Sequence, residues 1–169
     1  KTRIAASLGE YAAQRIYEAM LNDLASKLFS FDGRVTPFAS TSVSRESRIP
    51  WSSYRIQHGE SLGERMDDAF RCIFDEGARR AILVGTDIPG LSTRIIDEHF
   101  ASLDQRDLTI GPSTDGGYYL IGFRNDSFSS DFFYDIEWST DTDYQSTISK
   151  AARSGVGWYE GQKLPDVDD

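Results

Sequence analysis

The chain has 169 residues, of which 39% are hydrophobic and 27% are charged, and its formal net charge is −9. This length favours one domain that buries about two-thirds of its unfolded surface. The acidic balance argues against a nucleic-acid surface, which needs a basic stripe. No apolar stretch approaches the roughly 20 residues that span a bilayer, and none of the given residues form a secretory h-region.

Strands and helices alternate along the chain. Apolar residues at four-residue spacing predict a long amphipathic helix over 9–29. The further predicted elements are a strand over 35–40, a loop over 41–52, a strand over 54–57, a helix over 60–76, a strand over 81–85, a helix over 92–103, strands over 108–110 and 118–123, a helix over 140–153 and a strand over 156–159. The strands over 108–110 and 118–123 lie too close in sequence for a crossover helix, so they are antiparallel or non-adjacent. The pattern predicts an α/β fold with a mostly parallel sheet and an antiparallel insertion.

The most informative residue is Asp87, which follows the apolar run over 81–85 and precedes Ile88-Pro89-Gly90. A short apolar run of this kind predicts a buried parallel strand, and ligands of open α/β sheets bind at the carboxyl ends of such strands. The structural alternative is that Asp87 caps the next helix or stabilises the turn.

Two further acidic segments strengthen the functional interpretation. Asp115 follows another predicted strand, and Gly116 and Gly117 after it let the backbone approach a ligand or simply form a turn. Asp166 and Asp168 lie near the end of the sequence. Three acidic segments and only two His residues favour a hard-cation site that handles phosphate.

Two segments carry candidate phosphate ligands. Lys1 and Arg3 precede the first predicted helix, and a helix N-terminus with nearby cations attracts phosphate; the alternative is a solvated chain end. In the second segment Ser61 and Glu64 match a capping box, which is the more probable role of that segment taken alone. Its candidate ligand-binding residues are Gln57 for a base edge, Arg65 for a phosphate, and the glycines Gly59 and Gly63.

The single Cys72 cannot form an internal disulfide. Its helical setting favours a packed core thiol. One free cysteine favours a reducing compartment, so we expect a cytoplasmic protein.

Six pieces of sequence resemble one family in the same order. They are KTRI at 1–4, LGERM at 62–66, LVGTDIPGL at 83–91, GPSTDGGYYLIGF at 111–123, IEWST at 136–140 and LPDVDD at 164–169. The chain resembles the bacterial family of GT-A-type nucleotide-diphospho-sugar transferases, often encoded beside radical-SAM proteins. More distantly it is similar to 2-phospholactate guanylyltransferase and to the molybdenum-cofactor nucleotidyltransferases.

The resemblance implies a three-layer α/β/α, Rossmann-like nucleotide-binding fold over 1–169. It implies a first strand and a Gly-containing loop before the KTR piece, both outside this sequence. Asp87 matches the family's metal-binding aspartate, and Lys1 and Arg3 match its diphosphate-binding cations. Asp166 and Asp168 match an acidic pair that supplies a second metal ligand.

We therefore expect a metal-dependent transferase that uses Mg²⁺ or Mn²⁺ and a nucleotide-diphospho-sugar to glycosylate a small acceptor. Asp115 is expected on the acceptor side, where it orients or deprotonates a hydroxyl. The alternatives are a nucleotidyltransferase that couples an NTP to a phosphorylated acceptor and releases pyrophosphate, and a nucleotide-binding module without catalysis. The sequence predicts no oligomeric state, donor or acceptor.

Overall fold

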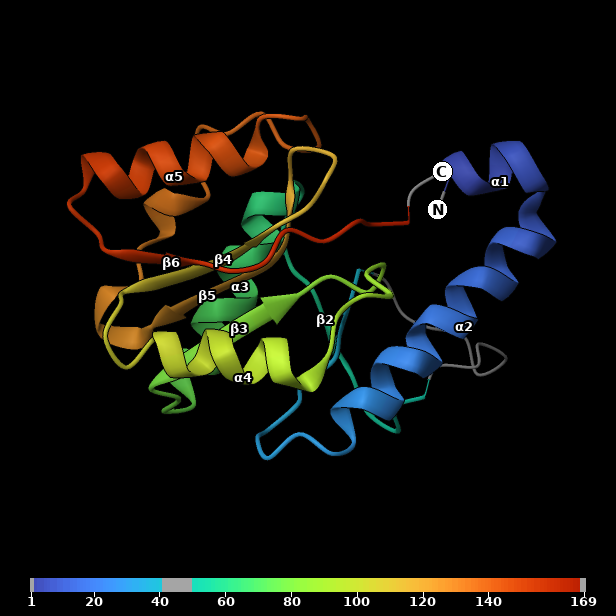
Figure 1. Cartoon of the computed structure of the whole chain (residues 1–169), viewed down its shortest axis with the longest axis horizontal. Helices are drawn as coiled ribbons and strands as arrows, with labels where there is room; N and C mark the ends of the chain where they lie inside the picture. Colours follow the sequence, from blue (N-terminus) through green and yellow to red (C-terminus); the bar gives the residue numbers. More distant parts are fainter. Residues whose placement is uncertain (1, 41–49, 168–169) are drawn as a thin grey trace.

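A four-stranded mixed sheet lies at the centre of the fold (Figure 1). The computed structural model describes residues 2–40 and 50–167, so most of the loop predicted over 41–52 lies outside the described residues. The strands, in spatial order, are β3 (Arg80–Val84), β5 (Tyr118–Arg124), β4 (Leu108–Pro112) and β6 (Trp158–Glu160). β4 and β6 are parallel, and β5 runs antiparallel between β3 and β4. The expected mixed sheet with an antiparallel insertion is confirmed.

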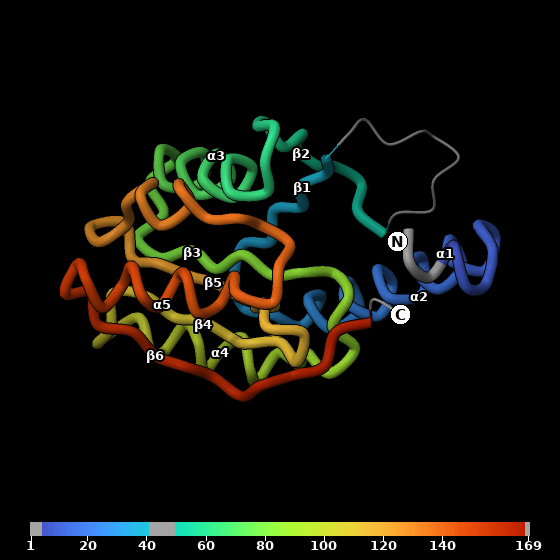
Figure 2. The backbone as a smooth tube through the Cα atoms, turned by 90° about the horizontal axis from the view of Figure 1, so that it is seen from above, coloured from blue at the N-terminus to red at the C-terminus, as the bar shows by residue number. Residues whose placement is uncertain are grey.

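Helices cover both faces of this sheet, as Figure 2 shows. α3 (Leu62–Asp75) and α5 (Asp143–Arg153) pack on one face, and α2 (Glu10–Leu28) and α4 (Thr93–Ser102) pack on the other. The two apolar clusters divide accordingly, because successive strand residues point to opposite faces. The three-layer α/β/α architecture is therefore confirmed.

The face under α3 and α5 is rich in aromatic side chains. The Phe70 ring stacks on Phe133 and meets the edge of Phe123, with ring centroids 5.9 and 5.1 Å apart. All three side chains are almost fully buried. Truncating such a residue to Ala costs about 3–5 kcal/mol, so this cluster anchors the frame that carries the loops.

The amino-terminal part of the chain lies beside the main sheet. The predicted helix over 9–29 is confirmed as α2, but residues Thr2–Leu8 form a further helix, α1, that the sequence did not predict. Gly9, at φ 85°, separates the two helices. β1 (Phe38–Ala39) and β2 (Arg55–Ile56) form a separate parallel pair. Among the described residues, no helix has the length and apolar character that crossing a bilayer requires.

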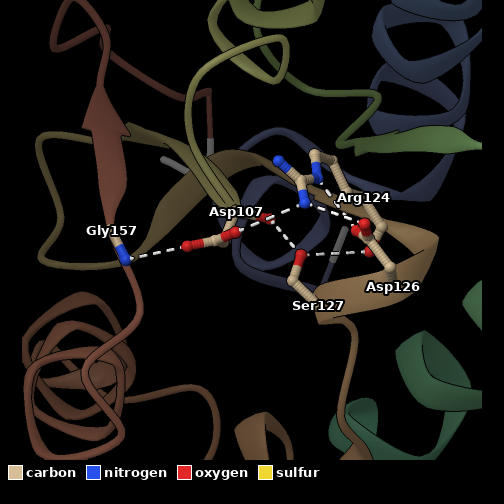
Figure 3. A network of polar contacts seen from close by, with 5 residues as sticks. All are labelled: Asp107, Arg124, Asp126, Ser127 and Gly157. Carbon is tan, nitrogen blue, oxygen red and sulfur yellow. Dashed lines mark hydrogen bonds and ion pairs between the residues drawn. The ribbon is translucent and has the colours of Figure 1, made fainter.

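Polar contacts close the end of the sheet where β4 begins and β5 ends (Figure 3). The Arg124 guanidinium makes two bonds to the Asp126 carboxylate, at 2.9 and 2.8 Å. Asp107 accepts the Gly157 amide at 3.2 Å through its carboxylate and the Ser127 hydroxyl at 3.0 Å through its carbonyl oxygen. The polar groups at this end of the sheet are therefore paired with one another. The acidic residues predicted to bind a ligand follow the opposite ends of β3 and β4.

Cys72 differs from its prediction as a packed core thiol. It is only half-buried on α3, and its Sγ lies 2.5 Å from Nη1 of Arg55. The same guanidinium pairs with Glu76 at the end of α3. The thiol faces the polar junction with β2 because α3 turns its apolar stripe toward the main sheet.

Candidate functional site

Asp87 lies just past the carboxyl end of β3. The Gly85 amide donates to the Tyr119 carbonyl oxygen at 2.8 Å, which extends the contact of β3 with β5 by one residue. A Cβ on Gly85 would lie 2.9 Å from Asp87 Oδ1, so the carboxylate folds back over this glycine. α4 begins later, and its N-cap is Ser92. Asp87 therefore does not cap that helix, which removes one of its two structural interpretations.

Asp115 sits in the tight loop between β4 and β5. Its Oδ1 accepts the Gly117 amide at 2.9 Å and also the Ser113 hydroxyl. Burial alone would raise the pKa of the Asp115 carboxyl, but these bonds and a contact with the Asp166 side chain outweigh it and hold the pKa below its ordinary value. Asp115 is therefore ionised at neutral pH, and one of its oxygens stabilises the turn.

Gly116 has a steric role in the same loop. Its φ is +94°, and an added Cβ would collide with the Asp141 backbone. The Tyr144 amide donates to the Gly116 carbonyl oxygen at 3.1 Å. The loop thus packs against the first turn of α5 and the residue Asp141 before it, and a side chain on Gly116 would displace the loop.

Residues 161–167, here called the strap, cross the ends of both acid-bearing strands. Leu164 pairs with the extension of β4, donating to the Pro112 carbonyl oxygen at 3.1 Å and accepting from Thr114 at 3.0 Å. Val167 then donates to the Asp87 carbonyl oxygen at 2.9 Å. The strap thereby carries Asp166 between the two loops. Three segments that are remote in sequence bring Asp87, Asp115 and Asp166 to one edge of the sheet.

The structure describes two of the expected metal ligands, Asp87 and Asp166. Within residues 2–40 and 50–167, no three or more His, Cys, Asp or Glu side chains are close enough to form a metal cluster. Asp168, Lys1 and the side chain of Arg3 lie outside the described part of the chain. Asp87 and Asp166 carry carboxylate oxygens, which are suitable ligands for Mg²⁺ or Mn²⁺. Two carboxylates are enough for such an ion, because it often takes one or two and completes its coordination shell with substrate phosphates and water.

The second candidate segment has a structural explanation of its own. The predicted capping box is confirmed, with Ser61 Oγ accepting from the Glu64 amide at 3.1 Å and the Glu64 carboxylate accepting the Ser61 amide at 3.2 Å. Arg65 donates to the carbonyl oxygens of Gly59 and Glu60 at 3.1 and 3.3 Å. Its guanidinium thus braces the loop in this structure.

The glycines of that segment are needed for packing. A Cβ on Gly59, whose φ is +127°, would lie 2.6 Å from Glu64 Cβ. Gly63 is buried against the Trp138 indole, and no side chain would fit there. Gln57 directly follows β2, and its amide donates to the Ala39 carbonyl oxygen at 2.8 Å. Each of these residues therefore has a structural contact within its own segment or with a packed neighbour.

Trp138 and Tyr119 were not among the predicted site residues. Trp138 lies between Gly63 and Tyr118, whose ring it meets edge-on at 6.4 Å, and so connects the start of α3 with the loop of Asp115. Tyr119 contacts both β3 and the strap, through its carbonyl oxygen and its hydroxyl. Their only sequence signal was the position of each within a piece that resembles the family.

Comparisons with known proteins agree with this fold. A family model described as "Uncharacterized protein conserved in bacteria (DUF2064)" matches residues 24–140. A crystal structure from Desulfovibrio desulfuricans G20, provisionally assigned as a nucleotide-diphospho-sugar transferase, has a TM-score of 0.92 and 32% identity over 99% of this chain and 75% of that one. A CMP:2-keto-3-deoxy-manno-octonic acid synthetase complexed with CTP has a TM-score of 0.56 and 11% identity over 88% of this chain and 82% of its own. The last likeness concerns the fold alone. No protein of curated function matches the chain significantly.

Proposed function

The chain belongs to the DUF2064 family, and from this membership we propose that it is a metal-dependent transferase that passes a sugar from a nucleotide-diphospho-sugar to a small acceptor. The observation that carries the proposal is the meeting of Asp87, Asp115 and Asp166 at the carboxyl edge of the sheet. Ligands of open α/β sheets bind at this edge. The 32% identical transferase-like relative supports the donor class.

In this proposal Asp87 and Asp166 hold Mg²⁺ or Mn²⁺, with Asp168 as a further ligand. The ion, when bound, would neutralise charge on the leaving nucleoside diphosphate. Lys1 and Arg3 bind the same diphosphate and also neutralise part of its charge. Each charge-assisted hydrogen bond from these cations is expected to contribute roughly 1.5–3 kcal/mol.

Asp115 acts on the acceptor in this proposal. Its lowered pKa keeps the carboxylate ionised, so it can orient the acceptor hydroxyl or take its proton as the hydroxyl oxygen bonds to the sugar and the nucleoside diphosphate leaves. The Gly117 amide and the Ser113 hydroxyl fix the carboxylate for this task.

The test starts from ligand binding. Thermal shift with nucleotides and nucleotide sugars, with and without Mg²⁺ or Mn²⁺, should identify a donor that stabilises the protein only with metal. Asp87→Asn should abolish this metal-dependent shift. The matched control is Asp97→Asn, which removes the same charge from an exposed position on α4. Equal shifts in both variants would refute the role of Asp87.

Product analysis then separates the chemistries. Release of a nucleoside diphosphate supports glycosyl transfer, whereas release of pyrophosphate identifies a nucleotidyltransferase. Metal-dependent binding without any turnover, across a panel of phosphorylated and hydroxyl acceptors, would identify a binding module. The same pocket can serve all three, because a fold does not determine the reaction.

A further inference from the structure

Tyr119 occupies an irregular position in β5. Along most of the β4–β5 ladder residues pair one to one, but Gly111 pairs with Leu120 whereas Pro112 pairs with Tyr118. Tyr119 is the extra residue of this β-bulge. As a result Tyr119 and Leu120 both join the cluster under α2 and α4, although successive strand residues normally alternate. Bulges of this kind redirect a side chain next to a functional site.

The redirected phenol reaches the strap. Its hydroxyl donates to the Gln162 carbonyl oxygen at 3.0 Å, between the points where Gly161 and Leu164 bond to β4. The Tyr119 side chain is only 3% exposed, and burial raises its pKa to about 12, so the hydroxyl keeps its proton and remains a donor. A Cβ on Gly111 would lie 2.5 Å from Tyr119 Cζ, so this glycine makes room for the ring.

The same residue holds the other acid-bearing segment. The Tyr119 carbonyl oxygen accepts from Gly85, two residues before Asp87, while its hydroxyl holds the strap four residues before Asp166. The buried bulge therefore connects the backbone on both sides of the proposed metal site. Asp166 contributes a side chain there, which contacts Asp115, and its neighbour Val167 donates to the Asp87 carbonyl oxygen. The course of the strap therefore helps to set the distance between Asp166 and Asp87.

We propose that Tyr119 is a positioning residue, whose hydroxyl fixes the strap and thereby sets the placement of Asp166 relative to Asp87. The part of this inference that concerns the metal rests on the proposed function. The part that concerns the strap rests only on the hydrogen bonds. Tyr119→Phe removes the hydroxyl and keeps the ring over Gly111. The matched control is Tyr159→Phe, a hydroxyl loss on β6, which pairs with β4 rather than with β5.

Two measurements test it on the whole chain. Mn²⁺ binding, followed by electron paramagnetic resonance, should weaken about 10-fold in Tyr119→Phe, the lower end of the range for groups that orient metal ligands. Tyr159→Phe should stay within about 2-fold of the parent protein, since within the described part of the chain the Tyr159 hydroxyl makes no hydrogen bond to the strap. Hydrogen exchange at the Leu164 and Val167 amides should accelerate in Tyr119→Phe and not in the control.

The outcomes separate the two proposals. Unchanged exchange of the strap amides in Tyr119→Phe overturns the positioning role. Faster exchange with unchanged Mn²⁺ affinity also overturns it, because the hydroxyl then serves the strap without serving the metal. If the parent protein binds no Mn²⁺ with any nucleotide, the metal-dependent function fails, and exchange alone still reports whether Tyr119 holds the strap.

Discussion

Burial of His99 makes the stability of this protein depend on pH. His99, on α4, is 1% exposed, and its Nδ1 lies 2.5 Å from Thr109 Oγ1. Its Nε2 is buried without a hydrogen-bond partner among the described residues. The rings of Tyr119 and Tyr159 lie edge-on to the imidazole, and Gly161 contacts it. Burial lowers the pKa of His99 from 6.5 to about 4.

This pKa shift determines the direction and the size of the change in the free energy of unfolding with pH. Between pH 6.5 and about pH 4 the unfolded chain binds a proton at His99 that the folded protein does not bind. The free energy of unfolding therefore decreases as the pH is lowered through this range, until His99 also takes up a proton in the folded protein. The loss is about 2 kcal/mol at pH 5 and about 3 kcal/mol at pH 4, relative to pH 7. A loss of this size is a large part of the stability of a small domain.

Urea unfolding of the parent protein and of His99→Asn between pH 7 and pH 4 measures this contribution. The difference in unfolding free energy between the two should shrink by about 2 kcal/mol from pH 7 to pH 5, since the variant lacks the titrating group. The control is His58→Asn at the other, exposed histidine. Equal pH dependence in the parent and His99→Asn would refute the reasoning, and titration of His99 by NMR gives its pKa directly if the variant does not fold.

Three further predictions concern β4, the N-cap of α3 and the loop of Asp115. Gly111→Ala should lower the free energy of unfolding by about 1–3 kcal/mol, because the new methyl group would collide with the Tyr119 ring. In the control Gly157→Ala, the nearest atom to the new Cβ is 3.7 Å away, so the change should stay within about 0.5 kcal/mol. Urea denaturation measures both variants, and equal losses would contradict the packing argument. Ser61→Ala should cost about 1 kcal/mol in the same assay because α3 loses its cap; an unchanged midpoint would count against the capping box. Asp115→Asn should keep the bond from the Gly117 amide and the donor affinity while transfer slows by roughly 10²–10⁴-fold, and unchanged turnover would reduce Asp115 to a turn residue.

Features determined by neighbouring residues were predictable from the sequence. The capping box of Ser61 and Glu64 depends on a spacing of three residues, and the structure contains it. The long helix over 10–28 and the existence of the strand that delivers Asp87 follow from local apolar patterns. The prediction that this strand is buried between parallel neighbours was wrong, because β3 lies at the edge of the sheet and pairs antiparallel with β5. The antiparallel insertion followed from the short interval between two strands.

Features that depend on remote partners were not predictable. Gly63 looked like a ligand-binding glycine, but its missing side chain makes room for Trp138, far along the chain. The bulge at Tyr119 has no local signature, because register depends on the pairing of the whole hairpin. Cys72 lies on a helix face whose polar neighbour, Arg55, comes from a different element. In each case the surroundings of the residue depend on contacts with segments that are distant in sequence.

The strap also has a consequence for the order in which the molecule assembles. The β4–β5 hairpin joins residues close in sequence, whereas the bond from Val167 to Asp87 joins residues that are far apart in sequence. Contacts of large sequence separation carry the greater loop-closure cost and form late. We therefore expect the sheet and its two aspartate-bearing loops to fold first and the strap to close over them last. Folding kinetics, rather than the strength of any one bond, would then decide when Asp166 joins the other two carboxylates.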